Sequence, residues 1–207
     1  MTEVPVPRLE SALRAHLVPA LREDGFSGSG RTYRRERAGW VHVVNVQSSR
    51  SGGQFAINLG LQPLSVCNAL GEMPDPKKII EPLCEFRRRL SDSGADQWWT
   101  HEPTQQSMNA AAQAANDSYV TTGRALFARV CGAHSPFDSV TPEEFALGTF
   151  DFGGFGSTRV RMALVLSRLR RAQGRASALA AFARIGLSGV GSAVALAREL
   201  TYLAEQQ

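Results

Sequence analysis

Histidine, cysteine and acidic side chains could together support acid–base or nucleophilic catalysis in this chain. Such chemistry needs a nucleophile, a base and a group that orients the base, all within hydrogen-bond reach. No local motif joins the candidates, which are His42, His101, His134, Asp92, Asp96, Glu102, Cys67, Cys84 and Cys131. No CxxC, HxxxH or HExxH spacing occurs either, so we predict neither a metal site nor a cofactor. The sequence therefore favours a protein that is not an enzyme.

Two of these residues have simpler structural interpretations. Cys84 alternates with strand residues, so we expect it to be a small, buried hydrophobic side chain. His42 shares one side of a predicted strand with Trp40, Val44 and Val46. We therefore expect a histidine packed in the core rather than a catalytic base.

Three side-chain amides form the first candidate binding site. Asn45 and Gln47 lie on one predicted strand and Asn58 lies on the next, with Arg50 in the loop between them. If the amides share a face of the sheet, they could form a polar groove for a peptide or a small polar ligand. The alternative, which we favour, is that they bond to one another and set the register of the sheet.

Basic residues form the second candidate site. Residues 151–207 contain eight arginines but only three acidic residues. The arginines that cluster are Arg161, Arg168, Arg170, Arg171 and Arg175. They predict either a surface for nucleic acid or an acidic protein, or simply the solvated face of a helix. Few aromatic residues accompany them, which argues against binding of single-stranded nucleic acid.

A glycine-rich loop, Gly153-Gly154-Phe155-Gly156-Ser157-Thr158, precedes a predicted helix. The free N–H groups of a helix N-terminus can bind phosphate. No GxxxxGK[ST] motif is present, however, and no clear strand precedes the loop. We therefore favour a flexible linker, with Ser157 as the cap of the helix.

Hydrophobic periodicity predicts the elements that position these residues. In the first helix Pro19 should cause a kink, and Gly25 should form a left-handed cap. Gly123 should divide a later helix, and Thr141 should begin another through a capping box with Glu144. Residues 27–30 are predicted as loop. The predicted helices are 8–24, 104–130, 157–173, 175–185 and 188–205, and the predicted strands are 31–37, 40–48, 54–61, 84–90 and a short one at 98–99.

Short turns between these strands require antiparallel pairing. We therefore predict an α+β domain over residues 1–150, with an antiparallel β-sheet of four to five strands and packed helices. The glycine-rich segment 149–156 is the predicted linker. It leads to a basic α-helical C-terminal extension over residues 151–207, in which one helical pair weakly resembles a tetratricopeptide unit.

Composition and cysteine content indicate the cellular compartment in which we expect the protein. Hydrophobic residues make up 43% and charged residues 20% of the chain, as in globular proteins. No run approaches the length of a transmembrane helix, and the first residues, which include Glu3 and Glu10, have no apolar stretch typical of a signal peptide. The odd number of cysteines fits a reducing compartment. We expect a cytoplasmic protein without membrane contact.

Four ordered pieces of the sequence are similar to a bacterial family known as domain of unknown function 4304. They are Leu21 to Gly25-Phe26; Gly30-Arg31-Thr32-Tyr33-Arg34 leading to Trp40; Val46-Gln47-Ser48 and Phe55-Ala56-Ile57-Asn58-Leu59-Gly60; and Cys84-Glu85-Phe86-Arg87 with Asp96-Gln97-Trp98-Trp99. The resemblance covers about residues 8–130. It implies a small α+β domain and no particular activity.

Three hypotheses about function follow. The first is a non-catalytic protein-binding module with a protein partner, and the lead that some relatives lie near toxin or defence loci suggests an immunity or antitoxin type. The alternative is nucleic-acid binding through the basic C-terminal helices. The third is binding of a small polar ligand, or an enzyme, at the groove of Asn45, Gln47 and Asn58.

Overall fold

The computed structural model describes residues 7–130 and 135–206, and in these ranges the chain forms one six-stranded antiparallel sheet with helices. The strand order is β1-β2-β3-β4-β5, and β6 pairs with β4. The strands are β1 Ser27–Ser29, β2 Thr32–Arg37, β3 Trp40–Ser48, β4 Gln54–Pro63, β5 Phe86–Arg89 and β6 Trp99–Thr100. The predicted α+β class with an antiparallel sheet is therefore confirmed.

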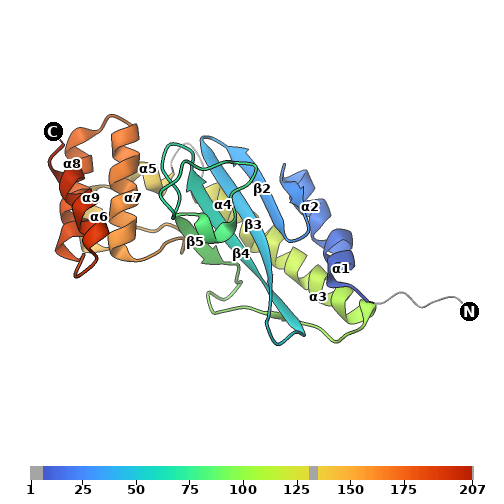
Figure 1. The fold of residues 1–207 in the computed structure, drawn as a ribbon. Helices are drawn as coiled ribbons and strands as arrows, with labels where there is room; N and C mark the ends of the chain where they lie inside the picture. The colour runs from blue at the N-terminus through green and yellow to red at the C-terminus, as the bar shows by residue number, and fades with distance from the viewer. Residues whose placement is uncertain (1–6, 131–134, 207) are drawn as a thin grey trace, which may run out of the picture.

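Helices lie behind the sheet and at one end of it (Figure 1). Helices α1, α3 and α4 cover one face, and α7, α8 and α9 lie together at the end of the molecule far from the N-terminus. The helices are α1 Leu9–His16, α2 Val18–Glu23, α3 Gln105–Ser118, α4 Arg124–Val130, α5 Pro136–Ser139, α6 Pro142–Leu147, α7 Arg159–Ala172, α8 Ala176–Ser188 and α9 Val194–Ala204, with a 3-10 turn at Glu81–Leu83 and a π-helical segment at Tyr119–Gly123. The predicted C-terminal helical region is confirmed. No helix in the described ranges is long and apolar enough to cross a membrane.

Strand β1 corrects one expectation, because residues 27–30 were predicted to be a loop. Ser27 to Ser29 pair with β2, although they contain no apolar residue to signal a strand. A Cβ on Gly28 would lie 2.3 Å from the carbonyl oxygen of Thr32, so glycine permits this close approach. The prediction failed because backbone pairing, not side-chain burial, holds this strand.

The two faces of the sheet differ. On the helix-covered face, alternate residues of β3 and β4 enter the main core, among them Val44, Val46, Ile57 and Leu59. On the opposite face, Val41 and Val43 pack against Ile79 and Cys84 of the irregular segment that follows β4. This segment covers only one end of the second face. The other end, next to the β3–β4 loop, carries the amides.

The first and middle helices agree with the predictions made from local sequence signals. The N-terminal helix breaks at Leu17, two residues before Pro19, and gives α1 and α2. Gly25 has a φ of 82°, and the N–H of Phe26 bonds to the carbonyl of Leu21, so the left-handed cap is confirmed. Near Gly123 the predicted division is a π-helical segment, which joins α3 and α4 without an interruption.

The C-terminal part begins with the predicted capping box. Thr141 accepts a hydrogen bond from the N–H of Glu144, and the Glu144 side chain accepts one from the N–H of Thr141. The cap of α7 is Thr158, whose hydroxyl accepts from the N–H of Arg161 at 3.3 Å. The expected cap at Ser157 is therefore wrong by one residue, because the hydroxyl that accepts from the first turn of α7 belongs to Thr158.

The glycine-rich segment before α7 packs against the sheet. Phe152 and Phe155 are buried, and the ring of Phe152 lies 4.4 Å from that of Phe137 between centroids. Gly156 exchanges two backbone hydrogen bonds with Arg87 on the outer edge of β5. These contacts attach the helical end to the sheet, while the domain boundary at residues 150–151 stays a prediction.

Candidate functional site

The open end of the second sheet face brings the three predicted amides together. Asn45 of β3 lies opposite Asn58 of β4, and Gln47 lies opposite Ala56. Because strand residues alternate between faces, all three amides point away from the helices. We call Asn45, Gln47 and Asn58, together with Arg89 and Trp98, the amide face.

Hydrogen bonds connect the amides within the sheet. The Nδ2 of Asn58 donates to the Oε1 of Gln47 at 2.8 Å, and the Nη2 of Arg89 donates to the same oxygen at 3.2 Å. Asn45 Nδ2 donates to the hydroxyl of Thr32 at 3.1 Å, which ties β3 to β2. These bonds agree with a register-setting role, and they also hold the side chains in fixed positions.

An arginine and a tryptophan extend the network. The guanidinium of Arg89 lies 4.6 Å from the ring centroid of Trp98, and its Nη1 lies 3.1 Å from Asp96. Trp98 Nε1 donates to the same carboxylate at 2.9 Å. The sequence analysis did not include Arg89 and Trp98 in the site. The alternation of Arg87 and Arg89 on a predicted strand was the signal that could have found Arg89.

A hollow of about 350 Å³ lies beside the amide face. It is lined by Arg88, Arg89, Gly94, Ala95, Asp96 and Gly154. Arg89 belongs to both the hollow and the amide face, so a ligand in the hollow could reach the amide network. The arrangement offers hydrogen-bond donors, acceptors and an aromatic surface, but no reactive group.

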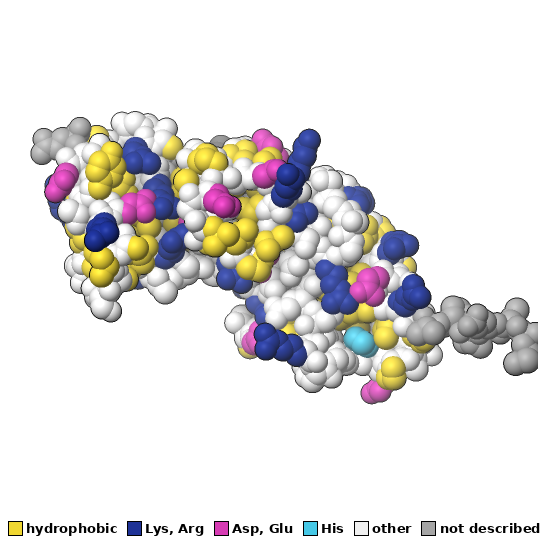
Figure 2. Space-filling model, in the orientation of Figure 1, with side chains coloured by type: hydrophobic (Ala, Val, Ile, Leu, Met, Phe, Trp, Pro, Cys, Tyr) yellow, Lys and Arg dark blue, Asp and Glu magenta, His cyan; other side chains and the backbone are white. Residues whose placement is uncertain are grey.

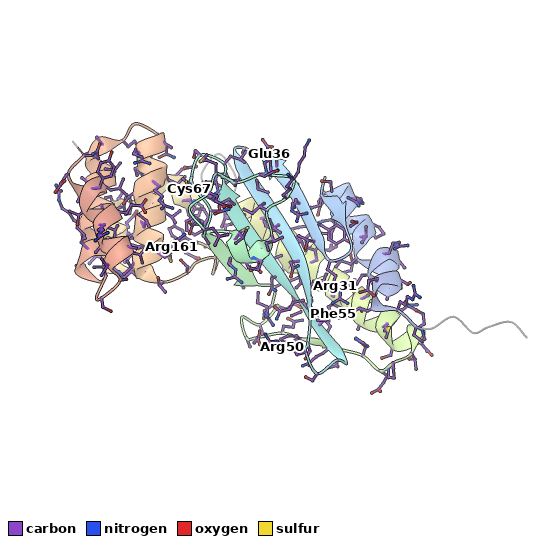
Figure 3. All side chains as sticks on the ribbon, in the orientation of Figure 1. Arg31, Glu36, Arg50, Phe55, Cys67 and Arg161 are labelled. Atoms are coloured by element: carbon purple, nitrogen blue, oxygen red, sulfur yellow. The ribbon has the colours of Figure 1, made fainter. Side chains whose placement is uncertain are left out.

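Arg50 is separate from the amides. It is exposed at the β3–β4 loop, where Figure 3 shows it near the end of the hairpin. It makes no hydrogen bond or ion pair with any residue in the described part of the chain. The structure thus leaves Arg50 at the margin of the amide face.

Most arginines of the predicted basic cluster form hydrogen bonds or ion pairs with other residues of the chain. Arg161 donates to the buried carboxylate of Glu85 at 2.8 and 2.6 Å. Arg168 donates to Glu199 at 2.7 and 2.8 Å, and its Nη1 lies 3.7 Å from Glu85. Glu85 precedes β5, so these ion pairs hold α7 against the sheet and α9 against α7. Arg161 lies at this junction in Figure 3.

The other three arginines of the cluster differ in exposure. Arg170 is 1% exposed and donates to the carbonyl of Val140 at 2.9 Å, and burial lowers the pKa of its guanidinium. Arg175 donates to the carbonyl of Asp138 at 3.0 Å. Arg171 is exposed, and its side chain has no hydrogen-bond or ion-pair partner among the described residues. Arg171 is therefore the member of the cluster that is most open to a ligand.

The strongest catalytic candidates lie on opposite faces of the sheet. His42 is fully buried and stacks on Phe127, with ring centroids 4.9 Å apart. Arg35 Nε donates to its Nδ1 at 3.0 Å, which leaves the ring proton on Nε2. Burial, and then the charge of Arg35, lower the pKa of His42 to about 3. Cys84 is buried on the other face, where burial and the carboxylate of Glu81 raise the pKa of its thiol. A base and a nucleophile are thus kept apart.

The remaining candidates make structural contacts. Asp92 accepts hydrogen bonds from Ser118 at 2.5 Å and Thr122 at 2.7 Å, which lower the pKa of its carboxyl group. His101 Nδ1 lies 3.1 Å from the carbonyl of Glu102. Cys131 and His134 lie outside the described residues. Within residues 7–130 and 135–206, no three His, Cys, Asp or Glu side chains are grouped so that they could hold a metal ion.

Part of the backbone of the glycine-rich loop forms hydrogen bonds within the protein. The N–H of Gly153 donates to the carboxylate of Asp151 at 2.7 Å, and the carbonyl of Gly153 accepts from Arg88. A carboxylate thus already occupies a position where a phosphate would accept. This contact favours a structural role for the loop.

In the comparison with known proteins, one family model matches part of the chain. Residues 17–118 match the model of the family described as domain of unknown function (DUF4304). The match confirms the resemblance and includes the whole amide face, while α7, α8 and α9 lie beyond it. No curated protein and no solved structure matches the chain.

Proposed function

Because this chain contains a DUF4304 domain, a family with no assigned function, we propose from the site itself that the protein is a non-catalytic protein-binding module. One observation carries the proposal. The amide face is a network of polar side chains on strands β3, β4 and β5 with Trp98 just before β6, at the end of the sheet that neither the helices nor the segment after β4 cover. Its members are held in place before any partner arrives, which lowers the entropy lost on binding.

The amide face has hydrogen-bonding atoms left for a partner. Gln47 is exposed, and its Nε2 makes no hydrogen bond within the described ranges. Asn45 is half-buried, and its Oδ1 likewise has no partner in the part of the chain that the structure describes. Arginine and tryptophan, here Arg89 and Trp98, are the residue types most enriched at the energetic centres of protein interfaces. This combination suits a protein surface better than a small reactive substrate.

The chemistry of the candidate residues supports a non-catalytic role. Neutral His42 is shielded by Phe127 and Arg35, and Cys84 is held as a thiol on the opposite face. General acid–base catalysis needs a group whose pKa lies near the working pH and that can reach the substrate. His42 meets neither requirement. Enzymatic action at the amide groove therefore receives less support than binding.

The narrower form of the proposal is an immunity or antitoxin protein, which would bind a toxin and block it. Binding of a small polar ligand in the hollow beside Arg89 remains the third hypothesis. Nucleic-acid binding through α7 has less support, since Glu85 and Glu199 already neutralise Arg161 and Arg168. Two findings together would support the narrower form: a toxin gene next to the gene of this protein, and a complex between that toxin and this protein on co-expression.

Photo-crosslinking tests the proposal. A photoreactive phenylalanine analogue replaces Gln47 in the full chain, and the protein is irradiated in an extract of its native host. We expect a covalent adduct with one protein species, because Gln47 is exposed at the centre of the amide face. Excess wild-type protein should remove the adduct, whereas excess Trp98→Ala protein should remove it at least tenfold less effectively.

The matched control carries the same analogue at Glu143, which is exposed on α6. Circular dichroism verifies that the Trp98→Ala variant is folded. Adducts that form equally at both positions, or that wild-type protein does not remove, would contradict the proposal. Retention of a small polar molecule by the purified protein, seen by native mass spectrometry and lost in the Trp98→Ala variant, would favour the third hypothesis.

A further inference from the structure

A second exposed surface lies where the segment after β4 meets α7 and α9. A pocket of about 250 Å³ is lined here by Ser65, Val66, Cys67, Met73, Arg168 and Arg171, with Ala172 and Glu199. Leu70 and Met73 of the same segment are 67% and 63% exposed. We define the junction surface as this pocket with Leu70, Met73 and Arg171. Figure 2 shows hydrophobic side chains gathered in the middle of this face with charged side chains around them.

We propose that the junction surface binds a short segment of a protein partner that carries an acidic residue beside a large apolar one. The inference rests on the proposed function in that both require a protein partner. It assigns a different surface, which lies outside the amide face and involves helices beyond the DUF4304 match. The proposal follows from the rigidity of the loop, the exposure of its apolar side chains and the charge of the opposite wall.

The loop that presents the apolar side chains is rigid. Asn68 is 5% exposed, and its Oδ1 accepts from the N–H of Leu70 at 2.9 Å and of Glu72 at 3.2 Å. Its N–H donates to the carbonyl of Glu72 at 2.8 Å, and the N–H of Ala69 donates to the carbonyl of Leu83 at 3.0 Å. These bonds fix the loop although Leu70 and Met73 gain no burial from it. Two large apolar side chains that stay exposed to water on a fixed loop are typical of an interaction surface.

The opposite wall of the pocket is positively charged at one point. Arg168 of α7 is neutralised by Glu199, its partner at 2.7 and 2.8 Å, and by Glu85. Arg171 lies one helical turn further along α7, is exposed and has no carboxylate partner in the described ranges. One acidic side chain from a partner would therefore give Arg171 an ion-pair partner. Arginine is suited to this, since its guanidinium binds a carboxylate through two hydrogen bonds.

The size and charge of the surface favour a peptide over nucleic acid. A single unpaired arginine beside Glu199 and the exposed Glu72 does not form the extended positive surface that a phosphate backbone requires. The apolar side chains of Leu70 and Met73 instead suit an apolar side chain of a partner, which the pocket of about 250 Å³ can hold.

The test uses the full-length protein and a displayed library of random twelve-residue peptides. We expect enrichment of peptides in which Asp or Glu lies next to Leu, Met or Phe. Binding of the enriched peptide should weaken at least tenfold in Arg171→Glu and in Leu70→Asp. It should also weaken when NaCl rises from about 50 mM to about 500 mM, because salt screens the new ion pair.

Each variant has a matched control elsewhere on the molecule. Arg14→Glu makes the same charge change on exposed Arg14 of α1, and Leu147→Asp changes the 78% exposed Leu147 of α6. Both should bind the peptide as wild type does. Equal loss in the controls, or no loss in Arg171→Glu and Leu70→Asp, would overturn the inference.

Three outcomes separate this inference from the proposed function. Peptides whose binding depends on Gln47 and Trp98, but not on Arg171 and Leu70, would overturn the junction surface and leave the amide face as the binding site. A labelled oligonucleotide that binds wild type tightly but not Arg171→Glu, with no peptide enriched, would overturn the junction surface as a peptide site in favour of nucleic acid. Failure to enrich any peptide would overturn the junction surface alone, because the amide face is tested by crosslinking.

Discussion

On the helix-covered face of the sheet His42 is packed in the core against Phe127, whereas on the opposite face Gln47 and Asn58 bond to each other at the end that the segment after β4 does not cover. His42 and Gln47 both lie on β3, only a few residues apart. Burial keeps the histidine neutral and inert, and partial exposure leaves the amides able to contact a partner. Strand alternation decides which face a residue takes, and what covers that face decides its chemistry.

The largest difference between the faces should appear in stability. Phe127 is 1% exposed and packs on both Phe26 and His42. Its replacement by alanine should lower the free energy of unfolding by about 3–5 kcal/mol, because it leaves a cavity in the core. Urea unfolding measures the change. A loss below about 1 kcal/mol would mean that the covered face is not the main core.

The pH dependence of stability tests the state of His42. Its pKa is about 3 in the folded protein and 6.5 as the ordinary value, so the unfolded chain takes up the proton first. The stabilisation is therefore complete above pH 6.5 and is lost as the pH falls towards 3. Between pH 6.5 and 5 the loss should be about 2 kcal/mol.

Urea unfolding at both pH values measures this loss in wild type and in His42→Phe, which keeps a flat ring on Phe127. The variant should lose most of the dependence between pH 6.5 and 5. His16→Gln, at a partly exposed histidine on α1, is the control and should retain it. The same slope in His42→Phe as in wild type would show that other groups cause the dependence.

The smallest effects are expected on the open face. Asn58→Ala removes the hydrogen bond to Gln47 from a residue that is 8% exposed, and should cost about 1–2 kcal/mol. Gln47→Ala removes an exposed side chain and should change stability by less, about 0.5–1 kcal/mol. Thermal unfolding compares the two. A larger loss in Gln47→Ala than in Asn58→Ala would contradict the interpretation that Asn58 anchors the network.

Elements with strong local signals could be predicted closely from the sequence. The β3–β4 hairpin followed from alternation, and α6 followed from the capping box of Thr141 and Glu144. Strand β1 could not be predicted, because Ser27, Gly28 and Ser29 have no apolar side chain and are held by backbone bonds to β2.

The candidate sites depended more on contacts distant in sequence. The sequence raised the condition that the three amides share a face, and the strand register places them on one. It did not include Arg89, which joins Gln47 across 42 positions of the chain. Arg161 pairs with Glu85 across 76 positions, so a cluster that suggests a basic surface in the sequence is largely internal in the structure. No periodicity or spacing contains this information, because ion pairs form between whichever charges the packed elements bring together.

By itself the sequence determined the order and type of most elements, the faces on which the residues of β3 and β4 lie and the resemblance to a family. These properties depend on local backbone preferences and on the period of apolar residues. Only the tertiary structure decided that His42 is neutral, that Arg161 and Arg168 hold α7 to the sheet, and that Gln47 and Arg171 remain open to a partner. Burial and pairing of charges depend on neighbours that folding brings from distant parts of the chain.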